Sequence, residues 1–226
     1  MKKLFFVFLL FSGFAFSQTA QDSIILLNGK VYKGSVIGIE SKRTDSVLTY
    51  KNEDGKVEHF STYRVYSYFK NNKSTIVYQK DEFKGNFLNK NEAREVTFGS
   101  YDARQTFKPI VPFVSSFALG LGASFSDTYL TKKEASDPGL TEPLTPGFFK
   151  RDPSWAPFII PAVLTVSWSF PSFKLKEKKV VHKEFYKNEN YYRGYHRIAR
   201  QKRMMAALTG SLSGIASGLI IHYIAQ

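Results

Sequence analysis

The chain contains no cysteine among its 226 residues. This absence excludes disulfide bridges, thiol catalysis, Cys-ligated metal sites and a lipid anchor attached through an N-terminal cysteine. Only four histidines are present, without the spacing of a metal site: His59, His182, His196 and His222. The sequence also lacks a Gly-x-Ser-x-Gly element, a P-loop and a His-Glu-x-x-His motif. We therefore expect no enzymatic activity, no catalytic residues, no metal and no cofactor.

Charge is scarce in the first seventeen residues, where only Lys2 and Lys3 carry it. Residues 4–16 form an apolar core that is short for a membrane-spanning helix. Ala15 and Ser17 fit the small-x-small pattern of a cleavage site. We expect residues 1–17 to be a signal peptide and the mature chain to work outside the cytoplasm. Export argues against a nucleic-acid partner, although the formal net charge is +13.

Residues 18–80 have the pattern of a small all-β unit. Short β-prone segments recur about every ten residues and are separated by turn residues. Asn28 followed by Gly29 is the strongest hairpin signal, and Asn71 with Asn72 marks another turn. Because a closed sheet has no edges to protect, we predict a small β-barrel rather than an open meander.

Residues 81–109 are polar, and we expect them to form a helical linker. Asn91 is the predicted N-cap, Gly99 weakens the helix, and Pro109 ends it.

Three uncharged or nearly uncharged stretches follow, at residues 110–130, 155–173 and 204–225. About twenty apolar residues cross a bilayer core as a helix. The last stretch has this length, the second nearly has it, and the first is marginal. The alternative is that all three are buried helices of a soluble domain. We predict an α+β membrane protein, with a small N-terminal β-barrel followed by two or three transmembrane helices in a membrane region of residues 110–226.

Small residues recur every four positions in the last stretch, at Ala206, Gly210, Gly214 and Gly218. This spacing places them on one stripe of a helix, where small side chains let a second backbone approach closely in lipid. The stripe predicts helix packing, either within one chain or between copies of a homo-oligomer.

Residues 174–203 are strongly basic, with eleven lysines and arginines against three glutamates. We interpret them as a basic loop that either lies beside lipid head groups, with Lys178, Lys179, Arg200 and Arg203 as contacts, or is solvated and only sets topology. Three spans would leave this loop outside, whereas the positive-inside rule prefers it in the cytoplasm. Two spans satisfy the rule, and we favour that interpretation slightly.

A short internal echo favours three spans instead. The tripeptide Ala103-Arg104-Gln105 precedes the first stretch, and Ala199-Arg200-Gln201 precedes the third. A true repeat would send both helices into the membrane in the same direction. We interpret so short a match as coincidence.

Two resemblances are visible. Residues 26–39, with Asn28, Gly29 and Gly34, look like the start of an SH3-like or Sm-like small barrel, whose RNA binding is not implied here. The order of segments, with Gly99 to Arg104 before one glycine-bearing stretch and Gly194 to Arg200 before the other, resembles uncharacterised exported membrane proteins of the Bacteroidota type. This resemblance implies a bacterial cell-envelope location and brings no catalytic residues.

The expected function is that of a non-enzymatic scaffold or adaptor in the cell envelope. The β unit is expected in the periplasm and the helices in the inner membrane, with lipid and an envelope protein as partners. One alternative is an oligomeric solute channel whose path is lined by Ser115, Ser116, Ser124 and Asp127. The other is an envelope sensor that reports through the basic loop.

Overall fold

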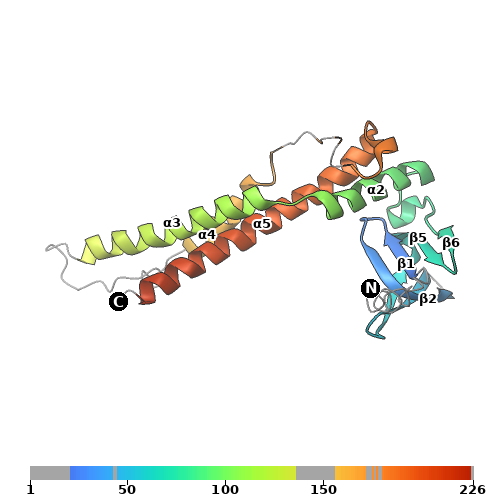
Figure 1. Cartoon of the computed structure of the whole chain (residues 1–226), viewed down its shortest axis with the longest axis horizontal. Helices are drawn as coiled ribbons and strands as arrows, with labels where there is room; N and C mark the ends of the chain where they lie inside the picture. The colour runs from blue at the N-terminus through green and yellow to red at the C-terminus, as the bar shows by residue number, and fades with distance from the viewer. Residues whose placement is uncertain are drawn as a thin grey trace, which may run out of the picture. The chain divides into compact units, whose positions relative to one another are not determined.

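The computed structural model describes residues 21–42, 45–135, 156–171, 175, 177 and 180–224 (Figure 1). The chain divides into two compact units, Met1–Ala93 and Arg94–Gln226. The expected signal peptide, Asp127's side chain and most of the segment between the first two apolar stretches lie outside what is described.

The first unit is a six-stranded antiparallel sheet with the strand order β4-β3-β2-β1-β5-β6. Its strands are β1 (Asp22–Leu26), β2 (Val31–Lys42), β3 (Asp45–Asn52), β4 (Val57–Ser61), β5 (Val65–Lys70) and β6 (Lys73–Ile76). The short 3₁₀ helices η1 (Thr62–Arg64) and η2 (Glu82–Lys84) follow β4 and β6. The prediction of an N-terminal β unit is confirmed. Within the described residues no ladder joins β4 to β6, so these strands are the edges of the sheet, and the ladder that would close the predicted barrel is not observed.

Both expected hairpin turns are present, but they differ in how many residues adopt a left-handed backbone conformation. At the first turn, the Gly29 N–H donates to the Leu26 carbonyl over 2.8 Å, and Gly29 alone has a positive φ, of 72°. At the second, Asn71 and Asn72 both have positive φ, of 49° and 62°. Two left-handed residues in a row are the signature of a type I′ hairpin.

The core of the sheet consists of apolar side chains that alternate along neighbouring strands: Ile24, Leu26, Val36, Leu48, Tyr50 and Val65. The Tyr50 hydroxyl donates to the Lys33 carbonyl. Gly34 lies directly against this tyrosine and the Lys51 backbone, so that a Cβ at Gly34 would fall well under 3.0 Å from both. Glycine is therefore required where β2 crosses Tyr50.

In the described part of the chain four α-helices follow: α2 (Lys90–Thr106), α3 (Ile110–Ala135), α4 (Ala156–Ser167) and α5 (Glu189–Ile224), with the 3₁₀ helix η4 (Lys183–Phe185) before α5. The N-cap of α2 is Asn89, not Asn91 as expected, because Asn89 Oδ1 accepts from the Asn91 and Glu92 N–H groups. In turn, the Glu92 carboxylate accepts a hydrogen bond from the Asn89 N–H, which completes a capping box. Gly99 does not interrupt this helix.

Two of the expected helix boundaries are wrong. α4 has 12 residues rather than the nineteen of the predicted stretch, and Pro171 lies shortly after its end. α5 has 36 residues and begins inside the predicted basic loop. Asn188 caps its first turn by accepting from the Asn190 N–H over 2.9 Å. Buried residues on one face then extend the helix: Tyr191, Tyr195, Ile198 and Ala199.

One described helix, α5, is by itself long and apolar enough to cross a membrane. α2 and the first part of α3 pass the same test only when they are taken together, across a bend of 57°.

Candidate functional site

The two long helices α3 and α5 run in the same direction and pack along their length (Figure 1). Gly210 meets the backbone of Phe113, and Gly214 meets that of Phe117 one turn further along both helices. A Cβ at either glycine would fall under 3.0 Å from a carbonyl oxygen of α3. The described glycines of the predicted ladder therefore pack against a helix of the same chain. Ala206, the first position of the stripe, is only half-buried.

A second close contact joins the first turns of α5 to α2, and it is reciprocal. Gly99 of α2 lies against the Tyr191 carbonyl, while Gly194 of α5 lies against the Val96 carbonyl. The Ser100 hydroxyl adds a bond of 3.2 Å to the Gly194 carbonyl. Each helix thus contributes one glycine. That glycine lies three residues after the residue of the same helix that the other helix's glycine contacts.

Where α3 packs on the apolar part of α5, mainly small and polar residues lie at the contact and large apolar residues lie outside. Ser116, Ser124 and Ser211 are at most 1% exposed, and the glycines lie beside them. Many exposed side chains of α3, α4 and the apolar part of α5 are large and apolar: Ile110, Val111, Val114, Leu119, Phe125, Ile159, Val163, Val166, Leu212, Ile220 and Ile221. This distribution is the reverse of a soluble helix bundle and matches helices packed in lipid.

Hydroxyl groups on these helices mostly bond to their own backbone. Ser115 donates to the Val111 carbonyl over 2.8 Å, and Thr165, Thr209 and Ser217 each bond to the carbonyl four residues earlier. Such bonds satisfy hydroxyls where no water is available. Ser124, expected in the channel alternative to line a path, lies against Gly218 in the helix contact.

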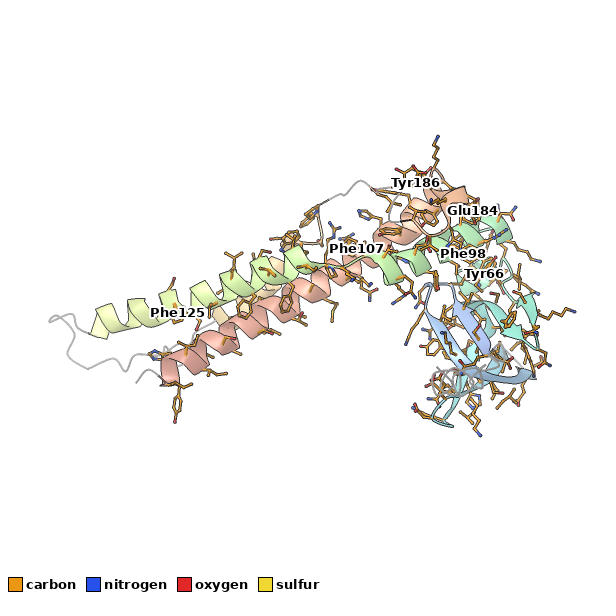
Figure 2. The ribbon with its side chains drawn as sticks, viewed as in Figure 1. Tyr66, Phe98, Phe107, Phe125, Glu184 and Tyr186 are labelled. Atoms are coloured by element: carbon orange, nitrogen blue, oxygen red, sulfur yellow. The ribbon has the colours of Figure 1, made fainter. Side chains whose placement is uncertain are left out.

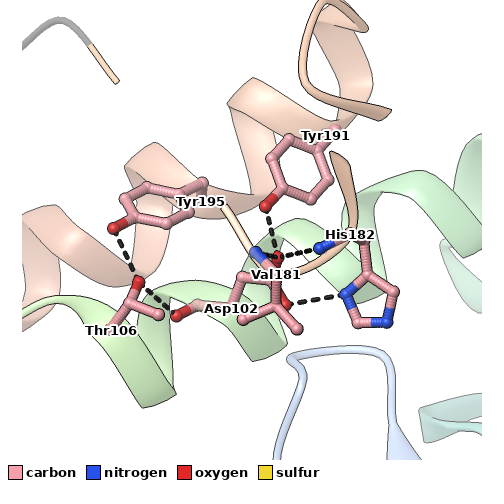
Figure 3. A network of polar contacts seen from close by, with 6 residues as sticks. All are labelled: Asp102, Thr106, Val181, His182, Tyr191 and Tyr195. Carbon is pink, nitrogen blue, oxygen red and sulfur yellow. Dashed lines mark hydrogen bonds and ion pairs between the residues drawn. The ribbon is translucent and has the colours of Figure 1, made fainter. Parts of the chain in front are cut away.

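A buried carboxylate, Asp102, organises the other end of the helical unit (Figure 3). It accepts from the Val181 and His182 N–H groups over 2.9 and 3.0 Å. It also contacts His182 Nδ1 at 2.8 Å and accepts from the Tyr191 hydroxyl over 2.5 Å. Burial, with Asp102 alongside, raises the pKa of Tyr191 far above its usual range, so that this hydroxyl remains a donor.

Aromatic side chains enclose the His182 ring. Phe98 stacks on it with a centroid distance of 4.4 Å, and Tyr101 meets it edge-on at 6.0 Å. Arg94 covers Phe98 and Phe185 in turn. The carboxylate and the imidazole both point into the protein and bind the segment of residues 180–182 to α2 and α5. This arrangement is that of an anchor for a chain segment, and no residue spacing in the sequence could reveal it.

Two basic residues of α5 are also bound within the protein. Lys202 Nζ donates to the carbonyls of Ala103, Arg104 and Phe107, which end α2, over 2.6 to 3.1 Å. Arg203 is 5% exposed and donates to the Pro171 carbonyl over 2.5 Å. Arg203 is therefore a structural contact rather than the exposed head-group contact that we predicted.

The other predicted head-group residues have different outcomes. Arg200 is exposed on α5, where contact with lipid head groups is open to it. Lys178 and Lys179 lie outside the described residues.

The β unit carries a groove of about 380 Å³ beside the edge strand β6. Three exposed apolar side chains line it, Ile39, Tyr63 and Ile76, and most of its other lining residues are polar or charged, among them Lys80, Asp81 and Lys84. Backbone groups of an edge strand and apolar side chains together form a surface that an extended peptide can bind.

Within the described residues, no group of three or more histidine or acidic side chains is placed to hold a metal ion. The chain matches no protein-family model, and no curated protein or solved structure is significantly similar to it.

Proposed function

We propose that the chain is a non-enzymatic membrane protein of the bacterial cell envelope, in which the helices form an anchor and the β unit acts as a scaffold or adaptor. The observation that carries the proposal is the reversed polarity of the helical unit. Glycines and buried serines join α3 to α5, while large apolar side chains cover the outside. In water this exterior would be an extensive aggregation-prone surface, whereas in lipid it is the normal one.

The dimensions support the anchor. Residues 204–224 of α5 extend about 32 Å at 1.5 Å per residue, which matches a hydrocarbon core of about 30 Å. α3 runs beside them for its whole apolar length and in the same direction. If α5 crosses the membrane, α3 crosses it the same way. We therefore propose three crossings instead of the two that the charge rule favoured, with α4 and its flanking residues returning the chain.

The β unit is proposed as the partner-binding part. The order in which β5 pairs back onto β1, with η1 between β4 and β5, supports an SH3-like arrangement. Such small barrels bind partners through grooves and edge strands. The groove beside β6 offers both, and the proposed partner is an envelope protein with an extended segment whose apolar side chains contact Ile39, Tyr63 and Ile76.

The test uses the full chain in its native membranes, with a photo-crosslinking amino acid placed at Ile76 in the groove or at Ile37. Ile37 is equally exposed, on β2, and does not line the groove. After a carbonate wash we expect the chain to stay in the membrane pellet and to give a discrete protein adduct at Ile76 but not at Ile37. Release into the supernatant would overturn the anchor. A retained chain without an adduct at Ile76 would overturn the adaptor role.

A further inference from the structure

We propose that the bend between α2 and α3 holds one anionic phospholipid in a defined groove. The proposal rests on the membrane embedding proposed above and goes beyond it, because it assigns a ligand class and a site. The groove has a volume of about 400 Å³. It lies beside the 57° bend, where α2 ends and α3 begins, against one face of α5.

One stripe of α5 forms the floor of the groove, and the bend forms its wall. Arg104 and Pro109 contribute from the bend, and α5 contributes Ile198, Gln201, Lys202, Met205, Ala206 and Thr209. From Ile198 to Thr209 the stripe extends about 16 Å along the helix axis. The groove is therefore long enough for a phosphate group and the first part of an acyl chain.

Along this stripe, polar and charged residues precede apolar ones. The buried Ile198 begins the stripe, and the cation Lys202 and the amide of Gln201 follow it, with the cation Arg104 contributed from the bend. Met205 and Ala206 follow toward the apolar part of α5, and Met205 is 55% exposed. A polar, positively charged end followed by an apolar floor fits a negatively charged head group and its attached chain.

The two cations have different roles. The Lys202 ammonium donates to three carbonyls that end α2, so its charge is fixed in place beside Phe107, which Figure 2 marks at the bend. Arg104 presents a planar guanidinium, which is suited to bidentate bonds with phosphate oxygens. Arg104 is thus the residue that should decide between an anionic and a zwitterionic head group.

The measurement is lipid retention by the full chain, purified in detergent and analysed by native mass spectrometry. Phosphatidylglycerol and phosphatidylcholine with identical acyl chains are added in turn. We compare Arg104→Gln with Arg193→Gln, which removes an exposed arginine of α5 outside the groove. We compare Thr209→Phe, which fills the groove from an exposed position, with Leu212→Phe on the outer face.

We expect the wild-type chain to retain one phosphatidylglycerol in preference to phosphatidylcholine. Arg104→Gln should reduce that retention about fivefold, as expected for one charge near a head group, and Thr209→Phe should reduce retention of either lipid. Both controls should behave like the wild type. Equal retention of the two lipids would overturn the ligand class, and unchanged retention in both groove variants would overturn the site. Carbonate extraction of the same chains measures anchoring separately, so an embedded chain without selective lipid overturns only this inference.

Discussion

Asp102 is a fully buried acid in a part of the chain that the sequence suggested was a polar linker. An isolated ionised carboxylate in such a place would be very costly. Four donors offset the cost here, and they come from residues about eighty to ninety positions away in the chain. The carboxylate therefore holds the segment of residues 180–182 against α2 and fixes where α5 begins.

Replacing Asp102 with Asn is expected to release that segment. The amide keeps the size of the side chain but has one acceptor oxygen instead of two, and its NH₂ group opposes the donors around it. We expect a loss of about 2–4 kcal/mol in the free energy of unfolding. Thermal unfolding in detergent should show it, and the amides of Val181 and His182 should exchange hydrogen faster.

Asp54→Asn is the matched control, because Asp54 is exposed in a turn of the β unit. That change should alter stability by less than about 0.5 kcal/mol. If Asp102→Asn left both the melting temperature and the exchange of Val181 and His182 unchanged, the anchoring role of the carboxylate would be wrong.

The sequence could identify some functional positions but not their partners. The glycines from Gly210 to Gly218 were visible because small residues every four positions have a direct meaning on a helix. Asp102, His182 and Lys202 were not, because a buried polar contact depends on which segments meet. Arg203 shows the same limit: its charge suggested lipid, while its position gave it the Pro171 carbonyl.

At the scale of helices, the close approach of α3 and α5 explains why glycine persists in a segment that otherwise favours a strong helix. Glycine costs a helix interior about 1 kcal/mol relative to alanine. The backbone contacts at Gly210 and Gly214 leave no room for a Cβ, so the packing of the two helices offsets that cost.

Gly214→Leu should force α3 and α5 apart. The added side chain would meet the backbone of Phe117 and Leu121, and overpacking of this kind costs about 1–3 kcal/mol. We expect a lower unfolding midpoint in mixed micelles as the denaturing detergent is increased. Ala216→Leu, on the exposed face of α5, should leave the midpoint unchanged. Equal midpoints for both variants would contradict a tight α3–α5 contact.

The strands were largely predictable, because turn residues separate β-prone segments and the structure places a strand in nearly every such segment. The start of α5 was not, because the basic residues hid an apolar stripe at helical spacing. Tyr191, Tyr195, Ile198 and Ala199 are buried on that stripe, while Arg193 between them is exposed. The net charge of the segment led to the prediction of a loop, whereas the periodicity of its apolar residues would have predicted a helix.

The short echo that we interpreted as coincidence falls on segments that pack together. Ala103 and Ala199 are both fully buried in one apolar cluster. Just before them, Gly99 and Gly194 make the reciprocal contact between α2 and α5. Two similar segments, running in parallel and packed face to face, are the arrangement that a true repeat would produce.

For the whole molecule, the parallel course of α3 and α5 predicts on which side of the membrane the β unit and the basic residues before α5 lie. No long apolar stretch lies between the β unit and α3. The β unit should therefore lie on the side from which α3 enters the membrane. Because α5 enters from that side too, the basic residues before it share the compartment of the β unit. The positive-inside rule counts lysines and arginines near the ends of the spans, so it opposes an external location of these basic residues. Lys202 and Arg203 are bonded to backbone carbonyls.

Single cysteines test this topology directly, since the natural chain has none. We place them at Lys56 in a turn of the β unit, at Lys183 before α5 and at Tyr223 near its end, all of which are exposed. A membrane-impermeant maleimide added to cells with a permeabilised outer membrane should label Lys56→Cys and Lys183→Cys, and should reach Tyr223→Cys only after lysis. Two crossings would instead protect Lys183→Cys and expose Tyr223→Cys. That pattern would mean that α3 and α5 cannot cross the membrane as one parallel pair, because a helix that enters from the opposite side would have to run antiparallel to its partner.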